Sequence, residues 1–204
     1  MGRYSLKDGK VTANKLAVSG KLPVQYVIPK TVAYSTAALL SNEDINANGT
    51  TAYAKKDILI QPAYAMPLLV TANAAGTAAN TDALTIVGVD GKGDVISESV
   101  IVSSTAKTST QSNNAFATIT SITPNAVSAC TSLGLGYNNA ELGLPYPIAV
   151  NTDIINYAYD GGYSTTAASG LTIDADYDTV TILGTAAAKV VQVTYKTVLQ
   201  EWGN

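Results

Sequence analysis

Short runs of apolar and β-branched residues, separated by turn residues, recur along the chain. The clearest run is Leu84–Val89, and residues 95–102 return with the same β-branched character. Asp90-Gly91 lies between the two runs, and an Asp-Gly pair in that position is the strongest local indicator of a β-hairpin. We therefore predict two antiparallel strands joined by a turn over residues 90–94.

Further short strands are expected around this hairpin. Residues 116–123 alternate between two faces and are expected to end at Pro124, whereas the polar stretch 103–114 is typical of a connection. Residues 31–40 fit either a strand or a helical turn. The pattern contains no long amphipathic helix and no strand–helix alternation, so it predicts an all-β sandwich, jelly roll or barrel. Other expected strand segments are 126–137, 154–159, 170–173, 178–183 and 190–198.

The beginning of the chain differs from the rest. Residues 4–28 alternate only loosely and are interrupted by Gly9, Gly20 and Pro23, which predicts short strands or an extended arm. We expect residues 1–60 to form an N-terminal arm with the first strands, and residues 61–204 to form a β-sandwich or jelly-roll body.

Charge also distinguishes the beginning of the chain, over residues 1–30. The 204 residues carry 12 basic and 15 acidic side chains, and the charged share of 13% is about half the usual ~25%. Residues 1–30 hold six basic side chains against Asp8 alone, so a basic leader precedes an acidic body. The leader either docks on an acidic surface or carries solvated lysines on exposed strands. Its scattered lysines lack interleaved stacking aromatics, so no nucleic-acid partner is expected.

Two residue counts exclude much catalytic chemistry. Histidine is absent, and Cys130 is the one cysteine. Without histidine there is no Ser–His–Asp or Cys–His arrangement and no histidine metal site, and one cysteine forms no disulfide within the chain. Cys130 is expected to be a small buried side chain. We expect no enzyme, no catalytic residue and no cofactor, and, because no apolar run approaches ~18 residues, no membrane span.

One group of carboxylates is a weak candidate for a metal site. Asp174, Asp176 and Asp178 are spaced by two, which in a strand places all three on one face, where their oxygens can share Ca²⁺. The alternative is a solvated polar face. The chain also holds 12 tyrosines against one phenylalanine and one tryptophan. Tyrosine is enriched at interfaces and is also an ordinary strand residue.

Several segments, in their order along the chain, resemble a family of tailed-bacteriophage virion structural proteins. In that family a strand–turn–strand with G-x-D-x-x-G and E-[ST] precedes an A-F strand, a glycine-rich stretch, L-G-L-P and a last strand. The resemblance is close over about 84–150, weak over 190–196 and slight over 1–60. The corresponding segments here are Leu84–Val100, Ala115–Thr123, Leu133–Tyr137, Leu142–Pro145 and Val191–Tyr195.

The resemblance implies a β-rich virion protein without catalytic residues, best described as a capsid decoration (cement) protein that stabilises the assembled shell. A tail or fibre component is the alternative within the class, and a carbohydrate-binding β-sandwich is the alternative outside it. The expected partners are the major capsid protein and further copies of the chain, as a trimer rather than a dimer. The expected location is the capsid surface, after synthesis in the host cytoplasm.

The leader is our candidate for the contact with the shell, by adding a strand to a neighbour's sheet edge. On this hypothesis, removing residues 1–30 leaves a folded body that no longer binds shells. The candidate contact residues are Arg3, Tyr4, Leu6, Lys7, Leu16, Val18, Leu22, Val24 and Tyr26.

Overall fold

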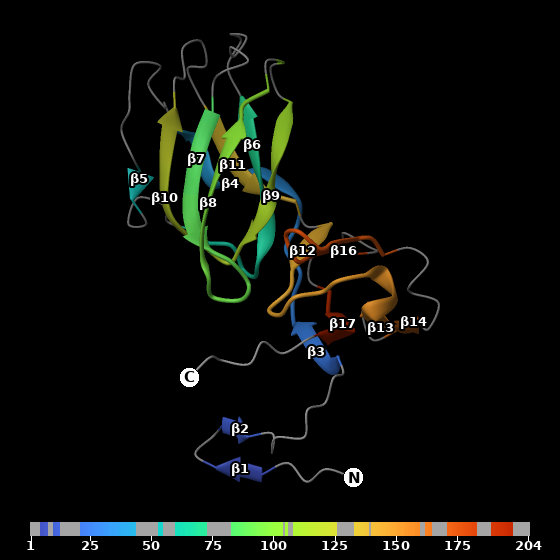
Figure 1. The fold of residues 1–204 in the computed structure, drawn as a ribbon. Coiled ribbons are helices and arrows are strands. Elements are labelled where there is room, and N and C mark those ends of the chain that lie inside the picture. Colours follow the sequence, from blue (N-terminus) through green and yellow to red (C-terminus); the bar gives the residue numbers. More distant parts are fainter. Residues whose placement is uncertain are drawn as a thin grey trace.

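The computed structural model is built almost wholly of antiparallel strands (Figure 1). It describes residues 5–7, 10–12, 21–43, 53–54, 60–72, 83–103, 105, 108–125, 133–138, 140–159, 162–164, 171–182 and 189–197. The strands up to the middle of the chain are β1 (Ser5–Lys7), β2 (Lys10–Thr12), β3 (Leu22–Ile28), β4 (Ser35–Glu43), β5 (Tyr53–Ala54), β6 (Met66–Ala72), β7 (Ala83–Val89), β8 (Val95–Ile101), β9 (Ser109–Phe116) and β10 (Thr118–Asn125). The later elements are β11 (Leu133–Tyr137), β12 (Glu141–Gly143), the short 3-10 helix η2 (Asn151–Asp153), β13 (Ile154–Tyr159), β14 (Gly162–Ser164), β15 (Ile173–Asp174), β16 (Thr179–Thr181) and β17 (Val191–Thr197).

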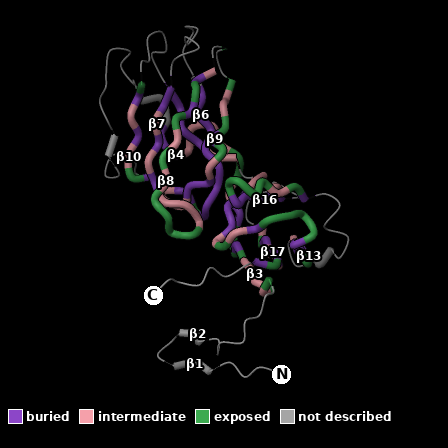
Figure 2. The backbone as a smooth tube through the Cα atoms, in the orientation of Figure 1, coloured by how far each residue is buried: buried purple, intermediate pink, exposed green. Residues whose placement is uncertain are grey.

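Two four-stranded sheets form the first lobe. Their strand orders are β5-β10-β7-β8 and β4-β11-β6-β9. Apolar side chains alternate along these strands, and Figure 2 shows the buried positions running along the inside of the lobe. The core residues are Leu39, Leu40, Leu68, Val70, Leu84, Ile86, Val100, Val102, Phe116, Ile119, Ile122, Leu133 and Leu135.

The second lobe is smaller and combines the sheets β12-β16-β15 and β14-β13-β17-β3. Its core takes side chains from both sheets and also from Tyr64 and Met66, next to and within β6 of the first lobe. The two lobes therefore share packing at their junction. The core residues are Ile28, Tyr64, Met66, Leu142, Leu144, Ile148, Ile154, Tyr157, Leu171, Val180, Ile182, Val191, Val193 and Tyr195.

The chain enters the second lobe twice. β3 belongs to the second lobe, the strands from β4 to β11 build the first, and the chain then returns at β12. Residues 1–60, where we expect an N-terminal arm and the first strands, contribute strands to both lobes. The all-β fold class is confirmed, with sheets stacked as sandwiches, whereas a jelly roll is not confirmed.

The end of the expected leader is an internal part of the fold. Residues 22–28 form β3, which pairs along its full length with β17. Val24 and Tyr26 pack against the second core, and Ile28 is buried within it. The alternation noted in the sequence is thus that of a strand with one face on a core, and β3 is no free arm.

Two other expectations need correction. The polar stretch 103–114 contains most of β9, where Ser112 is buried and its hydroxyl accepts a hydrogen bond from the N–H of Leu68 at 2.8 Å. Pro124 does not end its strand, because β10 continues to Asn125. Pro124 stays in register with Leu84 of β7, and β5 on the other side of β10 pairs only with Ser121 and Ile122. No described strand lies beside Pro124 on the β5 side, where a missing N–H is tolerated.

Candidate functional site

The candidate contact residues of the leader fall into two groups. Leu6 and Lys7 lie in β1, which pairs with β2 and with no other strand of the described chain. Leu22, Val24 and Tyr26 lie half-buried on the core-facing side of β3. The remaining candidates, Arg3, Tyr4, Leu16 and Val18, lie outside the described residues, as does Cys130.

The three aspartates proposed for Ca²⁺ do not share a strand face. Asp174 ends β15, and residues 175–178 form a turn. Asp174 accepts a hydrogen bond from the N–H of Asp176 at 3.0 Å, which closes this turn. Among the described residues, no group of three or more acidic or cysteine side chains is placed to hold a metal ion.

Asp178 instead connects the two lobes. Its Oδ2 lies 2.9 Å from Nζ of Lys92, which belongs to the β7–β8 turn of the first lobe. Its Oδ1 accepts a hydrogen bond from the N–H of Ile148 at 3.0 Å, and its carbonyl oxygen accepts another from Leu144 at 2.8 Å. The backbone of Asp178 is left-handed, with φ of 51°, a conformation that aspartate tolerates better than most residues.

The β7–β8 turn is ordered so that Lys92 reaches this carboxylate. Asp90 Oδ1 accepts hydrogen bonds from the N–H groups of Lys92 and Asp94, each at 2.9 Å. Asp90 Oδ2 also lies 3.5 Å from Lys92 Nζ. Burial disfavours the charged ammonium, but the hydrogen bond and charge of Asp178, with those of Asp90, outweigh it and raise the pKa of Lys92. The lysine therefore stays protonated at neutral pH.

Close backbone approach completes the junction. Gly143 of β12 donates a hydrogen bond to the carbonyl of Ala65 at 2.9 Å. A β-carbon at Gly143 would lie 2.6 Å from that of Ala115, and one at Gly91 would lie 3.0 Å from the carbonyl oxygen of Leu144. The hairpin, A-F and L-G-L-P segments of the sequence therefore meet at one place, where they hold the lobes together.

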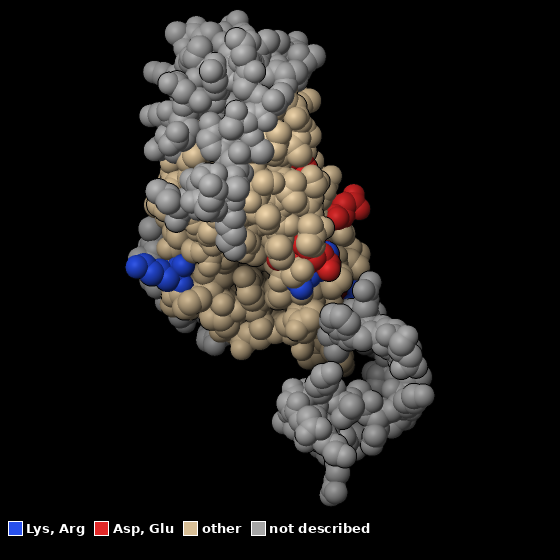
Figure 3. Space-filling view, turned by 90° about the vertical axis from the view of Figure 1, so that its left-hand side faces the viewer, with Lys and Arg blue, Asp and Glu red and all other residues tan. Residues whose placement is uncertain are grey.

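Glu141 adds a polar link between the same elements. Its Oε1 accepts a hydrogen bond from the Thr179 hydroxyl at 2.6 Å, and its Oε2 accepts one from Gln111 of β9 at 2.7 Å. On the face shown in Figure 3, most of the described surface is uncharged; acidic and basic side chains lie together toward one edge, and a separate basic group projects at the opposite edge. The junction is thus a structural contact made largely of main-chain groups and a few charges.

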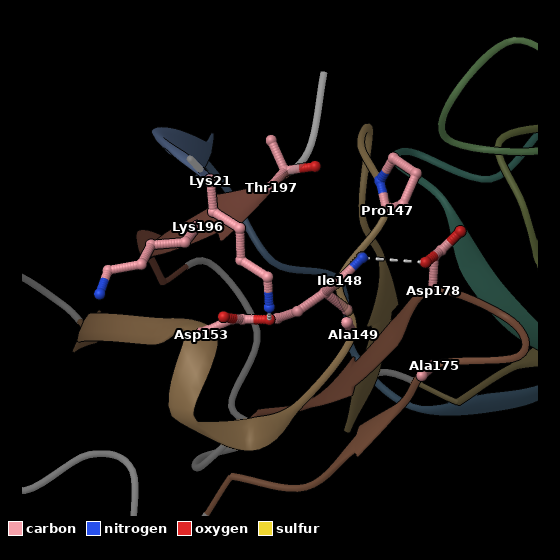
Figure 4. A pocket seen from close by; sticks show the side chains of 9 residues that line it. All are labelled: Lys21, Pro147, Ile148, Ala149, Asp153, Ala175, Asp178, Lys196 and Thr197. Atoms are coloured by element: carbon pink, nitrogen blue, oxygen red, sulfur yellow. Dashed lines mark hydrogen bonds and ion pairs between the residues drawn. The ribbon is translucent and has the colours of Figure 1, made fainter. Parts of the chain in front are cut away.

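A cavity of about 360 Å³ lies beside this contact in the second lobe, lined by Lys21, Asp153, Asp178 and Lys196 among others. Lys21 forms an ion pair with Asp153 (Figure 4). The Asp153 carboxylate also accepts a hydrogen bond from the N–H of Val150 at 3.2 Å. Burial of Asp153 works to raise its pKa, but these partners together lower it. The amine of Lys196 points away from Asp178 (Figure 4).

A second hollow, of about 620 Å³, lies where β3 approaches the first lobe. It is lined by residues 26–32, by residues 63–65, and by Gly91 and Ala117. The hydroxyl of Tyr64 is buried there without a hydrogen-bond partner of normal geometry. This hollow was not foreseen from the sequence, because its walls come from four separate segments.

The tyrosines divide between the core and the surface. Tyr64, Tyr157 and Tyr195 are buried, and the hydroxyl of Tyr195 both donates to the carbonyl and accepts from the N–H of Tyr146 at 3.2 Å. Tyr34 and Tyr146 are exposed, at 55% and 43%. The sequence alone does not separate these roles.

No family model, curated protein or solved structure matches the chain. In the described part of the molecule, no helix combines the length and the apolar character needed to cross a bilayer.

Proposed function

We propose that the protein is a structural component of a tailed-phage virion, a decoration protein that binds the assembled capsid through its leader. The observation that carries the proposal is the leader hairpin, β1 with β2, which pairs only with itself among the described residues. A two-stranded hairpin of three residues per strand is marginal alone in water and gains stability from a further strand. A neighbouring sheet edge supplies that strand.

Charge supports the same role for the leader. Residues 1–20 contain four basic side chains and one acidic side chain, whereas the whole chain has a net charge of −3. A positively charged segment ahead of an acidic body is suited to an acidic partner surface. The interlocked lobes form a body that many copies can place on a shell, and each copy contributes binding free energy only after assembly.

Copy number in purified particles is the first test. Quantitative mass spectrometry against the major shell protein is expected to give a ratio near parity or a sizeable fraction of it. A few copies per particle would instead indicate a tail or fibre component, and absence from particles would refute a virion role. A glycan array with and without chelator tests the carbohydrate-binding alternative.

The second test concerns the leader itself. Because β3 pairs with β17 and packs on the second core, the deletion should end at residue 20 and leave residues 21–204. We expect this truncated chain to melt like the full chain and to lose binding to shells. Asp8→Asn is the matched control, because it keeps the leader and raises its positive charge; it should bind at least as well. Binding by residues 21–204 would refute the role of the leader.

A further inference from the structure

β3 has one paired edge and one open edge. The strand order of its sheet is β14-β13-β17-β3, and all seven residues of β3 pair with β17. No strand of the described chain lies along its other edge. An open edge of this length presents a row of main-chain donors and acceptors to another strand.

Pro23 determines which residues face that edge. In an antiparallel pair, hydrogen-bonded and non-hydrogen-bonded positions alternate, and proline has no N–H to give. The register with β17 runs without a bulge, so Pro23, Gln25 and Val27 occupy the positions that point away from β17. The N–H groups of Gln25 and Val27 therefore point to the open edge. The side chains of all three residues are exposed.

The same strand borders the 620 Å³ hollow. Tyr26, Val27 and Ile28 line one side of it, and Ala63 and Tyr64 of the first lobe lie among the residues opposite. Strand addition draws affinity from main-chain hydrogen bonds and specificity from pockets that take alternate side chains. The open edge and the hollow together provide both requirements.

Charge around β3 indicates the chemistry of the occupant. Lys21 precedes the strand, Lys30 follows it, and Lys196 lies opposite Pro23 on β17. Lys21 is paired with Asp153. Lys30 and Lys196 are exposed, and no carboxylate of the described residues forms an ion pair with either.

These lysines disfavour a second copy of the chain as the occupant. Two β3 edges paired antiparallel about Gln25 would gather the exposed Lys196 of one copy and Lys30 of the other at the same end of the joined sheet, and this would happen at both ends. Like charges gathered at one end of a sheet repel each other and disfavour the pairing. The leader of another copy is also positively charged. Neither objection applies to an acidic strand, because its carboxylates would be attracted to these lysines.

We propose that the open edge of β3 binds an extended, acidic segment of another protein as an added strand, with one of its side chains in the hollow beside Tyr26 and Tyr64. This surface is separate from the leader hairpin. It receives a strand, whereas the leader donates one, so the proposal stands or fails independently of the capsid role.

A peptide-binding experiment with the full chain tests the proposal. The probe is a labelled heptapeptide that alternates threonine and valine and carries glutamate at both ends; the control peptide carries lysine at both ends. By fluorescence anisotropy we expect the glutamate peptide to bind at least about fivefold more tightly, with a preference that declines as salt rises. Equal affinities, or no binding of the glutamate peptide up to about 1 mM, would overturn the proposal.

Variants locate the binding edge. Val27→Pro removes an outward N–H and should weaken the glutamate peptide by at least about tenfold, whereas Val27→Thr keeps the N–H and should bind within about twofold of the parent. A double variant, Lys30→Glu with Lys196→Glu, leaves the strand intact and should reverse the peptide preference. Unchanged binding in both Val27→Pro and the double variant would refute the proposal. If sedimentation shows that the full chain forms dimers and that Val27→Pro dissociates them, a second copy occupies the edge, and the proposal is overturned.

Discussion

At the scale of single residues, Asp178 shows how one aspartate can hold two lobes together. The backbone of this residue is left-handed, and its side chain both forms an ion pair with Lys92 and accepts a hydrogen bond from the N–H of Ile148. Lys92 and Asp178 are 86 positions apart. Spacing along the sequence therefore gave no indication of the pair, and suggested a shared acidic face instead.

We expect substitutions at Asp178 to separate these contributions. Asp178→Asn keeps an acceptor for Ile148 and tolerates the left-handed backbone, so it should lower the free energy of unfolding by about 1 kcal/mol. Asp178→Ala also removes the acceptor and should cost about 2–4 kcal/mol. Urea unfolding measures both, with the exposed Asp176→Asn as a control within about 0.5 kcal/mol of the parent. Equal stability of all three variants would contradict the role assigned to Asp178.

Asp153 gives a prediction about pH. Its pKa is lowered in the folded chain, mainly because Lys21 and main-chain N–H groups outweigh the effect of burial. The ionised carboxylate therefore stabilises the fold above its ordinary pKa of about 3.9, and this stabilisation is lost as pH falls through the lower, folded value. We expect Asp153→Asn to be less stable than the parent by roughly 1 kcal/mol at pH 7, and the gap to close in strong acid. Unfolding curves across the acid range test this, and a constant gap would refute it.

At the scale of elements, local patterns located most strands and missed those held by tertiary contacts. The β7–β8 hairpin was predicted because Asp-Gly and β-branched runs act locally. β9 was missed because its Ser-Thr-Gln-Ser-Asn-Asn sequence has no apolar alternation, and the buried Ser112 is satisfied by Leu68 of a neighbouring strand. The hollow beside β3 was missed for the same reason, since its walls are distant in the sequence.

The contact of β12 with β9 is expected to be sensitive to a single added methyl group. Gly143→Ala would place its β-carbon 2.6 Å from that of Ala115 and 3.0 Å from that of Ala65. We expect it to lower the free energy of unfolding by about 1–3 kcal/mol in chemical denaturation. The double variant with Ala115→Gly removes the closest atom, and should be more stable than the sum of the two single effects. Strict additivity would show that this contact does not limit the packing.

At the scale of the whole molecule, the order of the strands makes the two lobes interdependent. The second lobe needs β3 from before the first lobe and β12 to β17 from after it. It also buries Tyr64 and Met66, from the chain segment at the start of β6 in the first lobe. No change of composition marks these crossings, so the sequence pattern suggested one division near residue 60. Its alternation nevertheless identified the strands on both sides.

This arrangement distinguishes the leader from β3 in a pair of truncations. Removal of residues 1–20 takes away β1 and β2, which pair with no other strand of the described chain, so the melting temperature should change by no more than a few degrees. Removal of residues 1–30 also takes away β3, including the buried Ile28, and turns β17 into an edge strand. We expect that chain to lose the near-ultraviolet signal of the buried Tyr157 and Tyr195 and the slow hydrogen exchange of β17. If residues 31–204 melt like the full chain, β3 does not support the second lobe, and its open edge loses its structural basis.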